Sequence, residues 1–133
     1  MRLVEDILDI TVHTGGYEEA LYREAVEGAC DKRSRCGACF RLRLTKTHQH
    51  AESLGFDYFT STLLVSPYQD QQLLRQIGEE ISKDSSAQFL FHDFRPGFRA
   101  AHTRARTLGF YSQKYCGCLA SLEERTSQKS FRP

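Results

Sequence analysis

The 133-residue chain is long enough for one compact domain, and its 40% apolar and 26% charged residues are typical of a globular protein rather than a disordered one. No stretch approaches the roughly 18 to 20 uninterrupted apolar residues of a membrane span. Acidic residues stand where a secretory signal would be apolar. We therefore expect a cytoplasmic protein without a membrane partner.

The net charge of +1 conceals an uneven distribution. Residues 1–29 hold seven acids against two bases, whereas residues 30–50 hold six bases against one acid. From residue 85 to the end there are eight bases and three acids. The two basic regions contain all five cysteines, and they could attract phosphate. A solvated surface face explains the same charge pattern equally well.

The first half of the chain predicts a strand followed by two helices. Residues 7–12 have the pattern of a short strand, and residues 17–26 that of an amphipathic helix. A second helix is expected to begin near Cys36 and to stop at Gly55, which suits the left-handed position after a helix. Cys36 and Cys39 would therefore lie at a helix N-terminus.

The second half repeats the alternation. Residues 58–65 predict a buried strand, and Ser66 and Pro67 suit the cap and first position of a third helix. Residues 88–91 predict another strand, and residues 99–108 a short helix that Gly109 ends. The apolar spacing of the third helix places four residues on its buried face: Leu73, Leu74, Ile77 and Ile81.

Strands that alternate with helices predict an α/β fold, with a small parallel sheet and flanking helices in a Rossmann-like three-layer arrangement. Such sheets carry their working sites beyond the carboxyl ends of the strands, so both cysteine pairs should meet at one edge. Three strands leave an open sheet edge, which suggests an incomplete domain. We expect residues 1–125 to form this domain, without its N-terminal part, and residues 126–133 to be a disordered tail.

The cysteines form two close pairs. Cys36 and Cys39 have the spacing of half a metal site, which suits structural zinc or an iron-sulfur centre and is also compatible with no metal. Unpaired amides at a helix start would stabilise their thiolates. Cys116 and Cys118 are too close for a relaxed disulfide, which suits an easily reduced redox pair, although two adjacent thiols without a shared role fit as well.

The five histidines give no further metal signal. His48 and His50 are two residues apart on a predicted helix and point to different faces, so we expect both at the surface. His13, His92 and His102 have no ligand-like spacing.

Four strings occur in order along the chain: RCGACFRLRL (35–44), FTSTLLVSPY (59–68), DFRPGF (93–98) and GFYSQKYCGC (109–118). Together they make residues 7–125 resemble the epoxyqueuosine reductase (QueH) family. The resemblance implies an oxidoreductase that reduces epoxyqueuosine to queuosine in the anticodon loop of transfer RNA. This reaction is a two-electron deoxygenation, and it implies an electron donor as a further partner.

The resemblance also implies roles for particular residues. Cys36 and Cys39 match one pair of ligands to a 4Fe-4S cluster, to which an additional iron ion could be added, and Cys116 and Cys118 match a redox-active catalytic pair. Cys30 has no counterpart. Family members supply the other cluster ligands from two adjacent cysteines, and this chain contains no Cys-Cys. We therefore expect it to be an inactive fragment that binds iron poorly.

Basic and aromatic residues in and near these strings are candidate contacts to RNA. The candidates for phosphate are Arg41, Arg43, Arg95 and Arg99, and those for base stacking are Tyr111 and Tyr115. The alternative interpretation is a non-catalytic, zinc-stabilised nucleic-acid-binding domain, in which the cysteines of both pairs bind one zinc ion.

Overall fold

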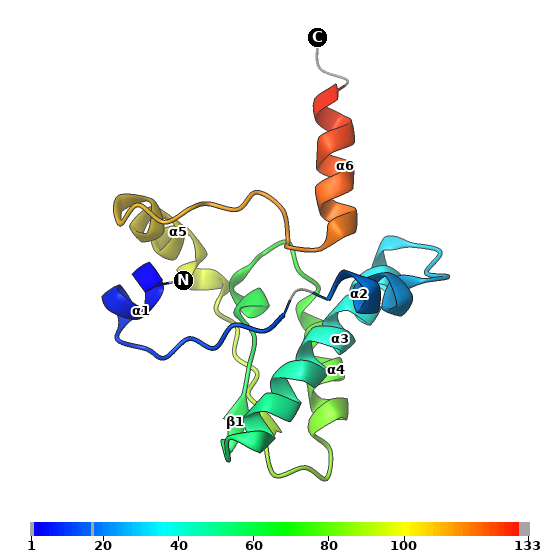
Figure 1. The fold of residues 1–133 in the computed structure, drawn as a ribbon, viewed down its shortest axis with the longest axis vertical. Helices are drawn as coiled ribbons and strands as arrows, with labels where there is room; N and C mark the ends of the chain where they lie inside the picture. Colours follow the sequence, from blue (N-terminus) through cyan, green and yellow to red (C-terminus); the bar gives the residue numbers. More distant parts are fainter. Residues whose placement is uncertain (1, 17, 131–133) are drawn as a thin grey trace. The chain divides into compact units, whose positions relative to one another are not determined.

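The computed structural model describes residues 2–16 and 18–130 (Figure 1). The chain divides into two compact units, one formed by residues 11–99 and the other by the described residues up to Ile10 and from Ala100 onward. The described residues form six α-helices and a two-stranded parallel sheet, so the fold mixes helices and strands. None of the described helices combines the length and apolar character needed to cross a bilayer.

The larger unit contains the sheet and its crossover helix. Its elements are, in order, α2 (Glu19–Val26), α3 (Lys32–Ser53), β1 (Tyr58–Phe59), the 3-10 helix η1 (Thr62–Val65), α4 (Gln71–Ser82), β2 (Gln88–Phe89) and the 3-10 helix η2 (Arg95–Gly97). In the parallel pair, Tyr58 lies opposite Gln88 and Phe59 opposite Phe89. Parallel strands need a crossover connection, which α4 supplies here.

The core of this unit lies between α3, α4 and the sheet. Three leucines at its centre, Leu44, Leu64 and Leu74, are at most 1% exposed. Burying a side chain of this size contributes about 1.5 to 3 kcal/mol. The predicted buried face of α4 is confirmed, because Leu74 and Ile77 are buried and Leu73 and Ile81 pack against the core.

The smaller unit is helical. It contains α1 (Arg2–Leu8), most of α5 (Phe98–Thr107) and α6 (Leu119–Ser130). The prediction that Gly109 ends α5 is confirmed: its φ is +76°, and its amide donates to the Arg106 carbonyl at 3.1 Å. The next amide, of Phe110, donates to Ala105 at 2.9 Å, which completes the turn after the helix.

Two predictions for the first third of the chain are wrong, a strand and the start of a helix. Residues 7–12 do not form a strand: Val4, Ile7 and Leu8 recur at helical spacing within α1, and the residue after the helix, Asp9, has a φ of +51°. Helix α3 begins at Lys32 rather than near Cys36, because the Asp31 side chain caps it by accepting a hydrogen bond from the Ser34 amide at 2.9 Å. The first cysteine pair therefore lies more than one turn inside the helix.

The strand predicted over residues 58–65 is also wrong beyond Phe59. The Ser61 hydroxyl accepts a hydrogen bond from the Leu63 amide at 3.2 Å and so starts η1 in place of further strand. Ser66 and Pro67 do not begin α4, whose cap is Asp70, bonded to the Leu73 amide at 2.9 Å.

Two further differences concern the sheet and the C-terminal region. The sheet has two strands among the described residues instead of three, and the three-layer arrangement stays a prediction. Helix α6 continues through Ser130, where the sequence predicts a disordered tail from residue 126, and residues 131–133 lie outside the described part.

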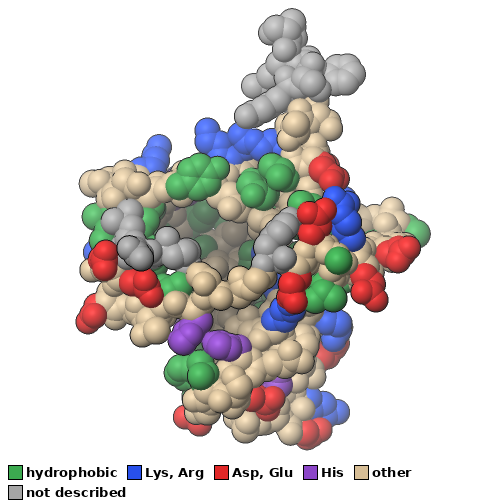
Figure 2. All heavy atoms as spheres, in the orientation of Figure 1, with side chains coloured by type: hydrophobic (Ala, Val, Ile, Leu, Met, Phe, Trp, Pro, Cys, Tyr) green, Lys and Arg blue, Asp and Glu red, His purple; other side chains and the backbone are tan. Residues whose placement is uncertain are grey.

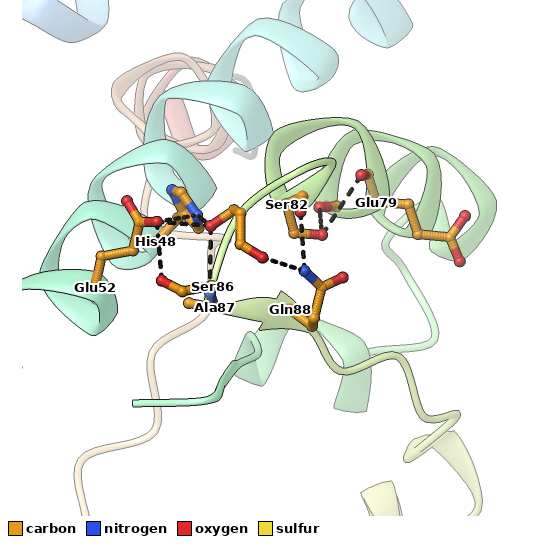
Figure 3. A network of polar contacts seen from close by, with 9 residues as sticks. His48, Glu52, Glu79, Ser82, Ser86, Ala87 and Gln88 are labelled. Carbon is orange, nitrogen blue, oxygen red and sulfur yellow. Dashed lines mark hydrogen bonds and ion pairs between the residues drawn. The ribbon is translucent and has the colours of Figure 1, made fainter. Parts of the chain in front are cut away.

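The turn between α4 and β2 is held to α3 by a hydrogen-bond network (Figure 3). The Ser85 hydroxyl donates to Glu52 Oε1 at 2.7 Å and accepts from the Ala87 amide at 3.2 Å. His48 Nε2 lies 2.6 Å from the Ser85 hydroxyl oxygen. A hydroxyl has one proton, and Ser85 gives it to Glu52, so His48 must be the donor at Nε2.

This network explains why His48 is not at the surface. The residue is 9% exposed overall, and its ring meets the ring of Phe59 edge-on, with 5.2 Å between the ring centroids. The expected surface position is therefore wrong for His48, while His50 is exposed and contacts His13 at 5.2 Å. The Ser85 hydroxyl is not arranged as a nucleophile, because its proton goes to a carboxylate rather than to the imidazole.

Phe89 fixes the distance between β2 and α4. Its ring occupies the space that a Cβ atom at Gly78 would need, so the helix and the strand meet at a glycine. In contrast, a Cβ atom at Gly37 of α3 would have Leu73 Cδ2 as its nearest neighbour at 3.6 Å, an ordinary contact.

We expect Gly78→Ala to lower the free energy of unfolding by about 1 to 3 kcal/mol, because the added methyl group overlaps the Phe89 ring. The matched control, Gly37→Ala, should be neutral or stabilising by up to about 1 kcal/mol, since alanine is the better helix former. Urea unfolding followed by circular dichroism measures both changes. Equal stability of the two variants would contradict the close approach of α4 and β2.

The loop after β2 is held by an ion pair between Asp93 and Arg95. Arg95 Nε and Nη2 donate to the two Asp93 carboxylate oxygens at 2.8 and 2.7 Å, and the Arg95 amide donates to Asp93 at 3.0 Å. These bonds, first of all those from the side chain, lower the pKa of Asp93 from 3.8 to about 2. A hydrogen bond from Ser85 likewise holds the pKa of Glu52 below its ordinary value.

A lowered folded-state pKa stabilises the protein above the unfolded-state pKa and loses that contribution as the pH falls through the folded value. We therefore expect Asp93→Asn to be less stable than the wild type above about pH 4, with the difference vanishing towards about pH 2. Urea midpoints measured across this range test it. The control is Asp57→Asn, at an exposed side chain that makes no ion pair among the described residues. A difference that persists at pH 2 would rule out the ion pair as its cause.

Candidate active site: two pairs of cysteines

The first cysteine pair lies inside α3, on the side of the helix that packs against the core. Cys39 is 7% exposed, and Cys36 is half-buried and contacts the core cluster. Three residues apart, the two thiols occupy neighbouring positions on one helix face. The amides from Arg35 onward bond within the helix, the first of them to Asp31 at 3.1 Å. The predicted stabilisation of these thiolates by unpaired amides is therefore wrong.

This pair has the ligand spacing of half a metal site. Two thiolates at this spacing match two of the four ligands that a 4Fe-4S cluster takes. Within either unit, the described residues contain no group of three or more His, Cys, Asp or Glu side chains placed to hold a metal ion. Cys36 and Cys39 thus fit a cluster as half of its ligand set.

The second cysteine pair stands at the N-terminus of α6. Cys118 is the residue before the helix: its carbonyl accepts from the Leu122 amide at 3.2 Å, and its Sγ accepts from the Ser121 amide at 3.3 Å. A side chain that accepts from the third helical amide is a helix cap, and here the cap atom is sulfur. The Cys118 sulfur therefore lies at the positive end of the helix dipole.

The two sulfur atoms of this pair lie 3.3 Å apart, with Cys116 Sγ as the donor. Gly117, between them, has a φ of +91°, a left-handed conformation that residues with a side chain rarely adopt. Both cysteines are reduced in the structure. Since a disulfide bond measures about 2.05 Å, the sulfurs need to approach by little more than about 1 Å to form one.

Ser121 contacts both cysteines, and sequence reasoning missed it. Its hydroxyl accepts from Cys116 Sγ at 3.1 Å and donates to the Cys118 carbonyl at 3.0 Å, while its amide reaches Cys118 Sγ. The available signal was its position three residues after Cys118, which is the spacing of a helix cap to its amide partner.

The candidate RNA contacts differ in how their charge is balanced. Arg41 donates to Glu80 at 2.6 Å, and Arg95 makes the bidentate pair with Asp93, so both guanidinium groups have a carboxylate partner. Arg43 is half-buried, and Arg99 is exposed. Of the tyrosines, Tyr111 is 85% exposed and Tyr115 is half-buried.

The remaining cysteine, Cys30, is exposed in the loop before α3. Its thiol donates to the Gly28 carbonyl at 3.5 Å. The convergence of the first and second cysteine pairs at one sheet edge stays a prediction.

Comparison with known proteins gives a consistent result. The family model described as "Epoxyqueuosine reductase QueH" matches residues 1–124. Proteins of that name from Dehalococcoides mccartyi and Thermotoga maritima are 34% and 35% identical over 82% and 78% of this chain. A third, from Helicobacter pylori, is 30% identical over 96% of it.

The matched regions make up 59%, 53% and 38% of these three relatives, so the chain spans from about two fifths to three fifths of their length. The family model nevertheless covers nearly all of this chain, including both cysteine pairs. The chain belongs to the epoxyqueuosine reductase QueH family.

Proposed function

We propose that these residues act in an epoxyqueuosine reductase, which removes the epoxide oxygen of epoxyqueuosine in the anticodon loop of transfer RNA. The names of the relatives support the reaction, and the 3.3 Å separation of the Cys116 and Cys118 sulfurs is the observation that carries the chemistry. Because the proposed substrate is transfer RNA, we propose that the reaction takes place in the cytoplasm. No observation favours the zinc-stabilised binding domain.

The second cysteine pair can supply the two electrons that the reaction requires. Converting an epoxide to an alkene takes up two electrons and two protons and releases the oxygen as water. Closing the Cys116 thiol and the Cys118 thiolate into one disulfide releases two electrons and one proton, and the second proton comes from solvent. One turnover of the pair thus matches one substrate, and an external electron donor must then reduce the disulfide.

The environment of the pair supports different roles for its two thiols. Cys118 is buried and accepts from the Ser121 amide, so it is the sulfur better suited to carry negative charge. Cys116 is half-buried and donates its thiol proton to Ser121 Oγ at 3.1 Å. We assign Cys116 as the thiol that approaches the substrate and Cys118 as the thiolate that closes the disulfide.

The first pair would have a different task. Cys36 and Cys39 would supply two ligands of a 4Fe-4S cluster, a group that transfers single electrons when it is bound. Their burial within α3 would keep both thiols on one face of a rigid helix. The arginine and tyrosine candidates named above would hold the RNA, with Arg99 and Tyr111 the more accessible members of that set.

The geometry predicts that mild oxidation closes the second pair before the first. With the chain treated with oxidised glutathione, the peptide that contains Cys116 and Cys118 should lose two hydrogen masses, and excess reduced glutathione should restore them. Mass spectrometry after alkylation and digestion measures this. The matched control is the Cys36 and Cys39 peptide, in which both thiols should still be alkylated. Preferential oxidation of that peptide would oppose the assigned roles.

The division of labour is tested in the full-length Helicobacter pylori relative, whose match covers 96% of this chain and therefore includes both cysteine pairs. The equivalent of Cys116→Ser should abolish turnover and leave iron content and visible colour largely intact, because one thiol cannot close a disulfide. The equivalent of Cys36→Ser should lose iron, colour and turnover together. Iron analysis and mass-spectrometric detection of queuosine report the outcomes, and equal iron loss in both variants would refute the assignment.

A further inference from the structure

Helix α5 and the segment after it carry positive charge without any acid. From Phe98 to Leu122 the sequence contains four Lys and Arg residues and no Asp or Glu. The larger unit is different: Arg23, Lys46 and Arg75 are each paired with a glutamate. Figure 2 shows acidic and basic side chains side by side over the region of α2 and α3. The α5 segment is therefore the better candidate for binding an anion from outside.

Arg104 and Arg106, in the last turn of α5, have exposed side chains that no ion pair among the described residues engages. Basic residues at this position can serve to cap a helix C-terminus. Here the backbone does so already, because the carbonyls of Arg104 and Arg106 accept from the amides of Leu108 and Gly109 at 3.0 and 3.1 Å. Capping does not explain the two guanidinium groups.

An exposed aromatic ring follows directly. Tyr111 is 85% exposed, and its neighbour Ser112 is held to α5 by a 3.2 Å hydrogen bond between the serine hydroxyl and His102 Nε2. This bond gives a role to His102, whose sequence context indicated none. It anchors the backbone beside Tyr111, so the ring is presented from a fixed segment without being buried by it.

We propose that Arg104, Arg106 and Tyr111 form a contact surface for a single-stranded RNA loop. Guanidinium groups bind phosphates through paired N–H donors, and exposed aromatic rings stack on the splayed bases of such loops. A partner protein with an acidic surface would pair with the two arginines, but such a partner would not explain the exposed ring of Tyr111. The inference rests on the proposed function, because it names the surface by which the same substrate is held.

The position of this surface along the chain fits the chemistry. Tyr111 precedes Cys116 by five residues, which span at most about 18 Å even when fully extended. A base stacked on Tyr111 is thus kept within a few nucleotides of the thiol pair.

The test measures binding of a fluorescent RNA hairpin with a seven-nucleotide loop to the full chain, by anisotropy at about 50 to 200 mM KCl. The double variant Arg104→Gln with Arg106→Gln should reduce the slope of log affinity against log salt by about 1.4 to 1.8, since each lost phosphate contact removes about 0.7 to 0.9. Tyr111→Ala should weaken binding by about 5- to 150-fold, the cost of one lost stack.

Two matched controls separate this surface from general charge and general aromatic content. Arg23→Gln with Arg75→Gln also removes two positive charges, from exposed arginines that are paired with Glu19 and Glu79. Tyr58→Ala removes another exposed ring, on β1. Both controls should bind the hairpin within about twofold of the wild type, and circular dichroism verifies that every variant is folded.

Undetectable binding by the wild type at 50 mM KCl, or equal weakening in the double variants of α5 and of the control, overturns the surface. Its failure and that of the proposed function are distinguishable. Normal hairpin binding through α5 without any reduction of epoxyqueuosine removes the function and leaves the surface. Reduction by the full-length relative, with this chain's binding insensitive to the α5 changes, removes only the surface.

Discussion

The contact between Phe89 and Gly78 sets the geometry of the larger unit. It lets β2 approach α4 closely enough for Phe59 and Phe89 to pair in register and for their rings to pack at 5.4 Å. The same register brings the Thr60 hydroxyl within 2.8 Å of the Leu90 carbonyl, to which it donates a hydrogen bond just before the Asp93 loop. A side chain at position 78 would push β2 away from the helix and displace all of these contacts together.

Sequence patterns predicted what depends on local spacing. The buried face of α4 and the end of α5 at Gly109 follow from helical periodicity and from the left-handed freedom of glycine. The strand predicted over residues 58–65 stops early because of one side chain. The Ser61 hydroxyl accepts a hydrogen bond from the Leu63 amide, and a 3-10 helix follows in place of further strand. The start of α3 differs from the prediction for a similar reason, because the Asp31 side chain caps the helix before Lys32.

The candidate site shows the same limit. The two cysteine pairs were recognisable from spacing, but the pairing of Arg41 with Glu80 joins residues 39 positions apart and depends on how α3 packs on α4. The helix N-terminus predicted for Cys36 is instead found at Cys118, because α6 was not expected beyond the thiols. Periodicity identifies a helix, but the side chain that caps it decides which residues lie at its end.

The sulfur cap of α6 links the chemistry of the second pair to the stability of a helix. In the reaction that we propose, closing the disulfide neutralises the Cys118 thiolate and removes the thiol proton that Cys116 gives to Ser121. A helix that loses its cap loses about 0.5 to 2 kcal/mol. The first turn of α6 would then fray in the oxidised protein and re-form on reduction. The helical order of this turn would therefore depend on the redox state of the cysteine pair.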